Sequence, residues 1–131
     1  MDKFKPIHIH LLLKCVIQRP FIDPENGKQF LVELVDRINM VPVTEPQCVY
    51  VSAPGNEGLT GSINLATSHI AWHCWDETGE LQLDVYSCTN FDHYVVLDTV
   101  EKYFHKIEKY HLIVLDRSNF NTILNIEEDE C

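Results

Sequence analysis

The centre of the chain reads as an antiparallel hairpin, and this feature limits the possible folds more than any other. Apolar residues occupy every second position of LQLDVYSC (81–88), which puts Asp84 and Cys88 together on the opposite face of a strand. The turn signal DETGE (76–80) precedes this segment, and the run before the turn (66–75) also suits a strand. A hairpin of this kind predicts a sheet built from neighbouring antiparallel strands.

The remaining elements fit around that hairpin. One helix is predicted by an apolar stripe from Phe30 to Ile38, and a second by Asp92 as a cap before a stripe from Val96 to Ile107. Further strands are predicted at 8–15, 47–53, 59–66 and 111–116, the last being the final clear strand. We therefore expect an α+β fold, a two-layer sandwich in which two helices pack on one face of a mainly antiparallel sheet.

Length and charge restrict the protein class and its partners. A chain of 131 residues predicts one domain, residues 1–131, with a real core. Ten basic and twenty acidic side chains give a formal charge of −10, which repels phosphate backbones and argues against nucleic acid as a partner. Part of this excess lies in the tail IEEDE (126–130), which we expect to be a solvated end. No apolar run is long enough for a membrane span.

The cysteines and the first residues indicate the compartment. The five cysteines are odd in number and widely spaced, without a C-x-x-C pair, so neither a disulfide framework nor a zinc ribbon is predicted. The segment MDKFKP leads into a short apolar stretch without a secretory cleavage pattern. We therefore expect reduced thiols in a cytoplasmic protein.

The segment ATSHIAWHCWDE (66–77) concentrates reactive side chains on the first strand of the hairpin. If the turn centres on residues 78–79, Cys88 lies opposite Ser68 or His69. His69 and His73 share a face but stand about 13 Å apart on a strand, too far for one metal ion. A Cys-His nucleophile pair from Cys88 and purely structural roles for these residues both stay open. The spacing of the residues does not choose between them.

A longer stretch resembles a known family. The segment GLTGSINLATSHIAWHCWDETGELQLDVYSC (58–88) is similar to the central part of the prokaryotic-type S-adenosylmethionine decarboxylases. That family shows a Gly-hydrophobic-Ser-Gly step, a Ser-His pair, a His-x-Trp step before a glutamate, and a strand that ends in cysteine. The resemblance is strong over about thirty residues and loose elsewhere, although HLLLKC (10–15) and YHLIVL (110–115) also fit the family layout.

This resemblance implies a cofactor made from the chain itself. Ser68 would attack the carbonyl of Thr67, and the chain would separate into residues 1–67 and 68–131, the second beginning with a pyruvoyl group derived from Ser68. Such a ketone forms a Schiff base with an amine substrate and accepts the electrons left when CO₂ departs. The implied activity is decarboxylation of S-adenosylmethionine for the synthesis of polyamines such as spermidine.

The resemblance also implies roles for individual residues. His73 would act as the base in the processing reaction. Thr60 would supply a hydroxyl beside the processing site, where the family usually has serine. Cys88 would return a proton after decarboxylation, and Glu77 would accept hydrogen bonds from the ribose. The family further implies a homodimer with its active site near the subunit boundary. Because Ser68 and His73 are five residues apart on a strand, we expect a bend or bulge near Ser68 that brings them together.

Several positions depart from the family pattern. Thr67 replaces the usual glutamate before the cut, Asp76 replaces proline and Thr89 replaces glycine. The segment CVYVSAPGNE (48–57) does not match the one that normally supplies an aromatic ring for the adenine. Trp72, Trp75 and Tyr50 are the candidates for stacking on the adenine instead. Two alternatives therefore stay open: a pyruvoyl-dependent decarboxylase of another amino acid, or an unprocessed, non-catalytic homologue with a binding or regulatory role.

Overall fold

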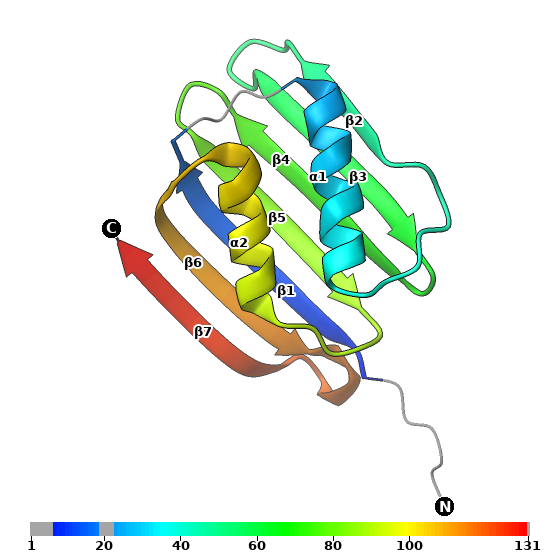
Figure 1. Ribbon diagram of the computed structural model, residues 1–131. Helices are drawn as coiled ribbons and strands as arrows, with labels where there is room; N and C mark the ends of the chain where they lie inside the picture. Colours follow the sequence, from blue (N-terminus) through cyan, green and yellow to red (C-terminus); the bar gives the residue numbers. More distant parts are fainter. Residues whose placement is uncertain (1–6, 19–22, 131) are drawn as a thin grey trace, which may run out of the picture.

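The structure, a computed structural model, describes residues 7–18 and 23–130; residues 1–6, 19–22 and Cys131 lie outside the described part. Within it the chain forms one seven-stranded sheet and two α-helices (Figure 1). The elements follow in the order β1 (Ile9–Ile17), α1 (Pro24–Arg37), β2 (Gln47–Val51), β3 (Gly58–Leu65), β4 (Ser68–Trp75), β5 (Glu80–Ser87), α2 (His93–Phe104), β6 (Ile107–Asp116) and β7 (Thr122–Glu130).

The strands are ordered β2-β3-β4-β5-β1-β6-β7, and every neighbouring pair is antiparallel. The first strand therefore lies in the interior of the sheet, between β5 and β6. Both helices pack on the same face, α1 over β2 and β3 and α2 over β1 and β6 (Figure 1). The predicted two-layer α+β sandwich is confirmed. We call the face that neither α1 nor α2 covers the open face; its side chains include His10, His69, His73 and Asp84.

Local sequence signals determine where both helices begin. The Asp23 side chain accepts a hydrogen bond from the Asn26 backbone N–H at 2.8 Å, and Pro24 occupies the first turn of α1, where its missing N–H costs nothing. As predicted, Asp92 caps α2 by accepting a hydrogen bond from the Tyr94 backbone N–H at 2.9 Å. Each helix then turns its apolar stripe toward the sheet, which fixes the helical layer over the core.

The core lies between the helices and the sheet. Alternate residues of the central strands point into it, as the period-two pattern requires. Trp72 is fully buried and stacks edge-on against Phe30 and Phe104, with ring centroids 5.6 and 5.4 Å away. Gly61 makes room for this indole, because a Cβ there would lie 2.4 Å from the Trp72 Nε1 atom. Other fully buried side chains are Leu11, Leu31, Leu34, Ile70, Leu81, Val85, Val96 and Leu112.

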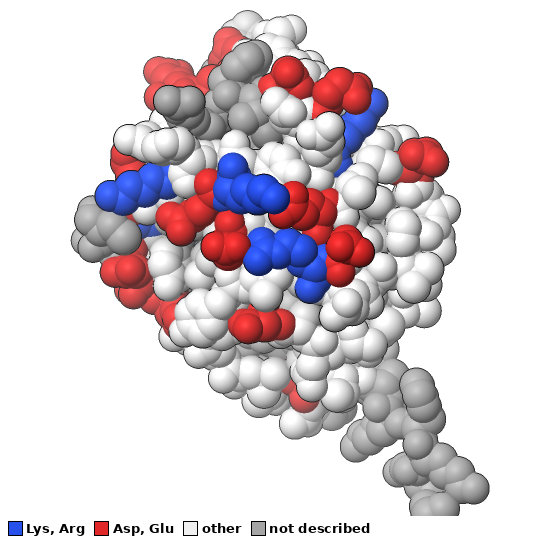
Figure 2. Space-filling view, viewed as in Figure 1, with Lys and Arg blue, Asp and Glu red and all other residues white. Residues whose placement is uncertain are grey.

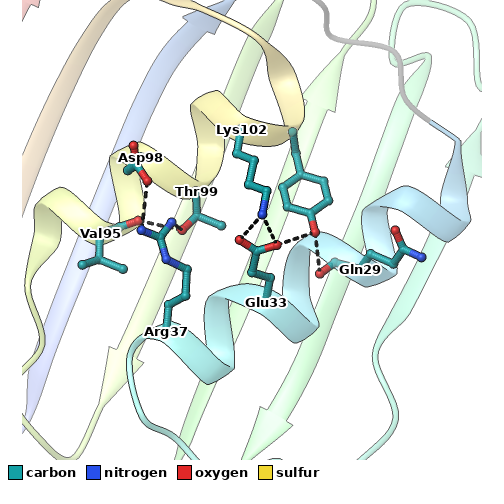
Figure 3. Close-up of polar contacts among 8 residues, drawn as sticks. Gln29, Glu33, Arg37, Val95, Asp98, Thr99 and Lys102 are labelled. Carbon is teal, nitrogen blue, oxygen red and sulfur yellow. Dashed lines mark hydrogen bonds and ion pairs between the residues drawn. The ribbon is translucent and has the colours of Figure 1, made fainter.

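A set of polar contacts joins α1 to α2 on the outer side of the helical layer (Figure 3). Lys102 contacts both carboxylate oxygens of Glu33 at 2.8 and 2.9 Å, and the Tyr103 hydroxyl donates to the same carboxylate at 2.9 Å. One turn away, Arg37 donates to the buried Thr99 hydroxyl at 2.6 Å and to Asp98 at 2.9 Å. These contacts hold the two helices beside each other.

Charge on this side of the molecule is mixed. Figure 2 shows the basic side chains over the helices surrounded by acidic ones, in keeping with the overall charge of −10. In the described part of the chain, neither helix is both long enough and apolar enough to cross a membrane.

Three details of the sequence-based expectation are wrong. The tail IEEDE is part of β7, which pairs with β6 from Lys109 to Asp116, so 111–116 is not the last strand. An acid-rich edge strand has a weak sequence signal, because backbone hydrogen bonds to its neighbour hold it and few of its side chains are buried. The β4–β5 turn is also centred one residue earlier than predicted, so that His69 faces Tyr86.

The expected bulge near Ser68 is the third error. Strand β4 pairs with β3 without a shift, from Ser68 opposite Leu65 to His73 opposite Thr60. Its pairing with β5 is equally regular. In an unbroken strand, residues five apart point to opposite faces. Ser68 therefore points toward the helical layer and is buried, whereas His73 is exposed on the open face.

Candidate active site

The predicted cleavage position lies in the tight turn that joins β3 to β4. Leu65 and Ser68 are paired, so Ala66 and Thr67 alone make the connection. Both loop residues are exposed, whereas only 7% of Ser68 is accessible to solvent. The Thr67–Ser68 peptide bond thus lies at the boundary between an exposed loop and a buried strand end. A cut at this bond would leave the β3–β4 ladder intact.

Cys88 completes this end of the hairpin. Its backbone N–H donates to the Ser68 Oγ at 3.1 Å, and its thiol sulfur lies 2.8 Å from the Thr67 Oγ1. The Thr67 hydroxyl also lies 2.6 Å from the Ala66 carbonyl oxygen. The predicted proximity of Cys88 to Ser68 is confirmed despite the shifted register. We refer to Thr67, Ser68 and Cys88 as the Ser68 group.

The contacts of Cys88 change the acidity of its thiol. Hydrogen bonds from the Thr67 and Ser68 hydroxyls hold the pKa of Cys88 below its ordinary value, because they stabilise the thiolate. The contribution of Thr67 is the larger of the two. Burial has the opposite effect on the other described cysteines: it raises the pKa of Cys15 to about 12 and those of Cys48 and Cys74 to about 11. Cys88 is therefore the most acidic thiol that the structure describes.

Thr60 and His73 form a second group at a distance from the first. They are cross-strand partners on β3 and β4, and the Thr60 Oγ1 lies 3.0 Å from the His73 Nδ1. Five residues of extended strand separate His73 from Ser68, a distance of about 17 Å along β4. The structure therefore brings Thr60 to His73, and Cys88 to Ser68, but it does not bring the two groups together within one chain. We refer to Thr60 and His73 as the His73 group.

The remaining candidate residues lie near the β4–β5 turn, except Trp72, which lies in the core. Glu77 is exposed in the β4–β5 turn, further from Ser68 than the His73 group is. Near this turn the Tyr50 hydroxyl donates to Asp76 at 2.8 Å, and the Trp75 indole N–H donates to Asn56 at 3.2 Å. Trp72, a candidate for stacking on a ligand, belongs to the core and presents no ring surface to solvent.

Sequence reasoning missed a polar cluster on the open face, where β1, β4 and β5 meet. The Asp84 Oδ1 lies 3.5 Å from the His10 Nε2 and 3.7 Å from the His69 Nε2. These three atoms lie within 4.8 Å of one another, close enough to suggest metal ligands. However, Arg117 lies 3.2 Å from the His10 Nδ1, and a guanidinium can only donate. Neutral His10 therefore carries its proton on Nε2, facing Asp84, which does not suit a metal ligand.

Comparison with known proteins defines the family. The model of a family described as S-adenosylmethionine decarboxylase matches residues 9–118, which is most of the chain and includes the Ser68 and His73 groups. The chain belongs to the S-adenosylmethionine decarboxylase family. An S-adenosylmethionine decarboxylase proenzyme from Methanococcus vannielii is 35% identical over 83 residues. That match spans 62% of this chain and 63% of the proenzyme, so it covers less than two thirds of either.

A solved structure shows the same fold. The crystal structure of the adenosylmethionine decarboxylase from Aquifex aeolicus has a TM-score of 0.70 to this chain and covers 97% of it, and all of that chain is matched. The sequence identity is 22%, so this likeness is evidence for the fold alone. The family suspected from residues 58–88 and the predicted fold are both confirmed.

Proposed function

We propose that this protein is a pyruvoyl-dependent decarboxylase of S-adenosylmethionine that first cuts itself between Thr67 and Ser68. The observation that carries the proposal is the Ser68 group: a buried serine, at a two-residue turn, beside an acidified thiol. Family membership supports the substrate and the reaction class. The products of the cut would be residues 1–67 and residues 68–131, so the intact chain is a zymogen.

The position of Ser68 suits it as the source of the cofactor. The Cys88 N–H holds the Ser68 Oγ at the start of β4, beside the carbonyl of Thr67 that it would attack. Because the cut falls in the loop, both products keep their strand pairing and the new chain end stays in place. When formed, a pyruvoyl ketone supplies an electron sink for the electron pair left by departing CO₂. Cys88 is within reach of that position and would deliver a proton to the reacting carbon.

The separation of the two groups supports a homodimeric enzyme. His73 is proposed to remove a proton during processing, with Thr60 as its hydroxyl partner, yet both lie about 17 Å along the strand from Ser68 of the same chain. In a symmetric pair the same surface faces its copy, so the His73 group of one subunit could meet the Ser68 group of the other. We propose that each active site is shared in this way, near the subunit boundary, and that Glu77 binds the ribose there.

The biological setting follows from the proposed reaction. Decarboxylated S-adenosylmethionine provides aminopropyl groups for polyamines, so we propose a role in spermidine synthesis. The four described cysteines are free, which supports a reducing, cytoplasmic location. The charge of −10 supports a small-molecule substrate rather than nucleic acid or an anionic membrane.

One observation favours a second candidate function. Trp72 is buried in the core, and the segment 48–57 lacks the family's usual aromatic position, so the support for an adenine site is weaker than the support for pyruvoyl chemistry. A pyruvoyl-dependent decarboxylase of another amino acid would retain the Ser68 group unchanged. A third candidate function is that of an unprocessed homologue with a binding or regulatory role. It is suggested by Thr67, which stands where the family usually has glutamate.

Release of CO₂ from carboxyl-labelled substrates separates these functions. We expect the wild-type protein to release label from S-adenosylmethionine, and the Ser68→Ala variant to release none because it lacks the cofactor precursor. Ser52→Ala, which changes an exposed loop serine, is the matched control and should retain activity. Release from a different amino acid instead would support the second candidate, and no release from any substrate would support the third.

A further inference from the structure

The residue before the proposed cut has an unfavourable backbone conformation. Thr67 has a φ of 59°, in the left-handed region that L-residues avoid. Among the described residues, five non-glycine residues have positive φ, and Thr67 is the only one of them with a β-branched side chain. A β-branched residue is a true outlier in this region because its Cβ substituents crowd the backbone. The strain is therefore located at the residue whose carbonyl Ser68 would attack.

The residues of the β3–β4 turn, Ala66 and Thr67, are not the types that favour the backbone conformation of this turn. Two-residue hairpin loops favour turns with positive φ at the first loop residue or at both, and these positions usually hold glycine or asparagine. Here only the second loop residue, Thr67, has positive φ, and the loop contains neither glycine nor asparagine. Ala66 and Thr67 thus form a turn that other residues would form at lower cost.

Contacts on both sides prevent the turn from relaxing. The Ala66 backbone N–H donates to the Val41 carbonyl at 2.9 Å, which fixes the first loop residue. Beyond the turn, the Cys88 N–H bond to the Ser68 Oγ fixes the start of β4. Strain persists at a residue only when its surroundings determine the conformation in this way.

We propose that the strained conformation of Thr67 promotes the self-cleavage of the chain, an inference that rests on the proposed function. In the first step the Ser68 Oγ bonds to the Thr67 carbonyl carbon, the bond from that carbon to the Ser68 nitrogen breaks, and the Oγ proton passes to the nitrogen. The amide becomes an ester with no other reactant. The step relieves strain, because the link from the Thr67 carbon to the Ser68 Cα then runs through two atoms instead of one.

The later step completes the release. In the elimination the proposed base His73 takes the Ser68 Cα proton, a double bond forms between Cα and Cβ, and the Cβ–Oγ bond breaks. Thr67 then leaves as a carboxylate chain end, which no longer has to connect β3 to β4. Strain present in the intact chain and lost as the turn opens raises the ground state relative to the transition state, and so lowers the barrier. Thr67 acts in this proposal as a positioning residue through its backbone, and its hydroxyl group is not required.

Substitution of Thr67 tests the proposal because shape and hydroxyl can be varied separately. Thr67→Asn and Thr67→Gly accept positive φ, so we expect the purified precursor to cleave about tenfold more slowly, equivalent to about 1.4 kcal/mol in the barrier. Thr67→Val keeps the β-branch and the size but loses the hydroxyl. It should cleave faster than Thr67→Asn and Thr67→Gly, because it keeps the strained turn. The measurement is the time course of full-length chain and fragments by mass spectrometry.

A second measurement does not depend on cleavage. In a Ser68→Ala background, which cannot be cut, Thr67→Asn should raise the melting temperature by about 3 °C because the strain is removed. Thr67→Val should not raise it. Absence of stabilisation by Thr67→Asn, or equal slowing of cleavage by Thr67→Val and Thr67→Asn, overturns the role of strain. A wild-type chain that never cleaves overturns the proposed function instead, so the two failures are distinguishable.

Discussion

Thr67, Ser68 and Cys88 occupy one end of a hairpin, and the short contacts among them give Cys88 its chemistry. The thiol accepts hydrogen bonds from two hydroxyls, and both favour its ionised form. A proton donor with a lowered pKa gives up its proton readily, but it holds that proton over a narrower pH range. In the uncut chain the Cys88 thiolate therefore forms at a lower pH than in an ordinary cysteine. Processing would remove the Ser68 hydroxyl, so this lowered pKa is a property of the precursor.

Alkylation of Cys88 tests this account of its acidity. In the uncut Ser68→Ala chain, Thr67→Val removes the hydroxyl that contributes most to the lowered pKa. We expect the pH midpoint for iodoacetamide labelling of Cys88 to rise, and labelling at neutral pH to slow, because less thiolate is present. The labelled peptide that contains Cys88 is followed by mass spectrometry. An unchanged midpoint would show that the Thr67 contact does not acidify the thiol.

Buried cysteines provide the internal control for that experiment. Cys15, Cys48 and Cys74 have raised pKa values and little exposure, so they should label slowly in both chains. Faster labelling of these three in the variant would indicate unfolding rather than a change at Cys88.

At this scale the sequence predicts some features of the site and misses others. Alternation on β4 and β5 places Cys88 near Ser68, and that part holds even though the turn is centred one residue earlier. Nothing in the sequence predicted the positive φ of Thr67, because Ala-Thr is not a turn-forming pair. The cluster of His10, His69 and Asp84 was also missed: its members share one face by alternation, but only the strand order shows that β1 lies beside β5.

At the scale of elements, the contacts between α1 and α2 stabilise the layer above the site. Lys102 holds the pKa of Glu33 below its ordinary value of 4.5, chiefly through its hydrogen bond. A carboxyl with a lowered folded pKa contributes stability above its unfolded pKa, and the contribution is lost as the pH falls through the folded value. The pair is partly exposed, so its contribution is modest.

Removing the lysine should show that dependence on pH. We expect Lys102→Met to lower the free energy of unfolding by about 0.5 kcal/mol at pH 7. The difference from wild type should shrink as the pH falls below 4.5, because protonated Glu33 no longer favours a nearby cation. Thermal unfolding at a series of pH values measures it, with Lys106→Met as an exposed control. A difference that stays constant down to acid pH would rule out the ion pair as its source.

Elements with a strong pattern were predicted and one with a weak pattern was not. Periodicity and Asp92 predict both helices, and period-two alternation predicts the central strands, since these segments bury one face. Strand β7 is held mainly by backbone pairing to β6, and its acidic residues suggested a solvated tail. The prediction of a bulge in β4 was wrong for a different reason. It assumed that Ser68 and His73 must meet within one chain.

At the scale of the whole molecule, the distance between the Ser68 and His73 groups is the main structural fact to explain. Ser68 and His73 lie five positions apart on the regular strand β4 and point to opposite faces of the sheet. A change of rotamer cannot cover about 17 Å, so a single subunit does not assemble both groups into one site. Two copies provide the simplest way to join them.

Co-expression of two inactive variants tests a shared site. Ser68→Ala lacks the residue that is cut, and His73→Ala lacks the proposed base, so neither chain should cleave when expressed alone. In a mixed dimer, Ser68 of the His73→Ala chain would meet His73 of the Ser68→Ala chain. We expect fragments from the His73→Ala chain only, identified by a tag on one variant. Cleavage of His73→Ala alone, or no cleavage in the mixture, would contradict the shared site.

The central claim is that this chain makes its own cofactor by cutting itself, and intact-mass measurement of the purified protein tests it most directly. We expect two fragments, residues 1–67 and 68–131. Their masses should sum to that of the whole chain plus water minus ammonia, because the serine amine is replaced by a ketone oxygen. The Ser68→Ala variant should stay whole. A wild-type protein that remains a single full-length species would contradict the account.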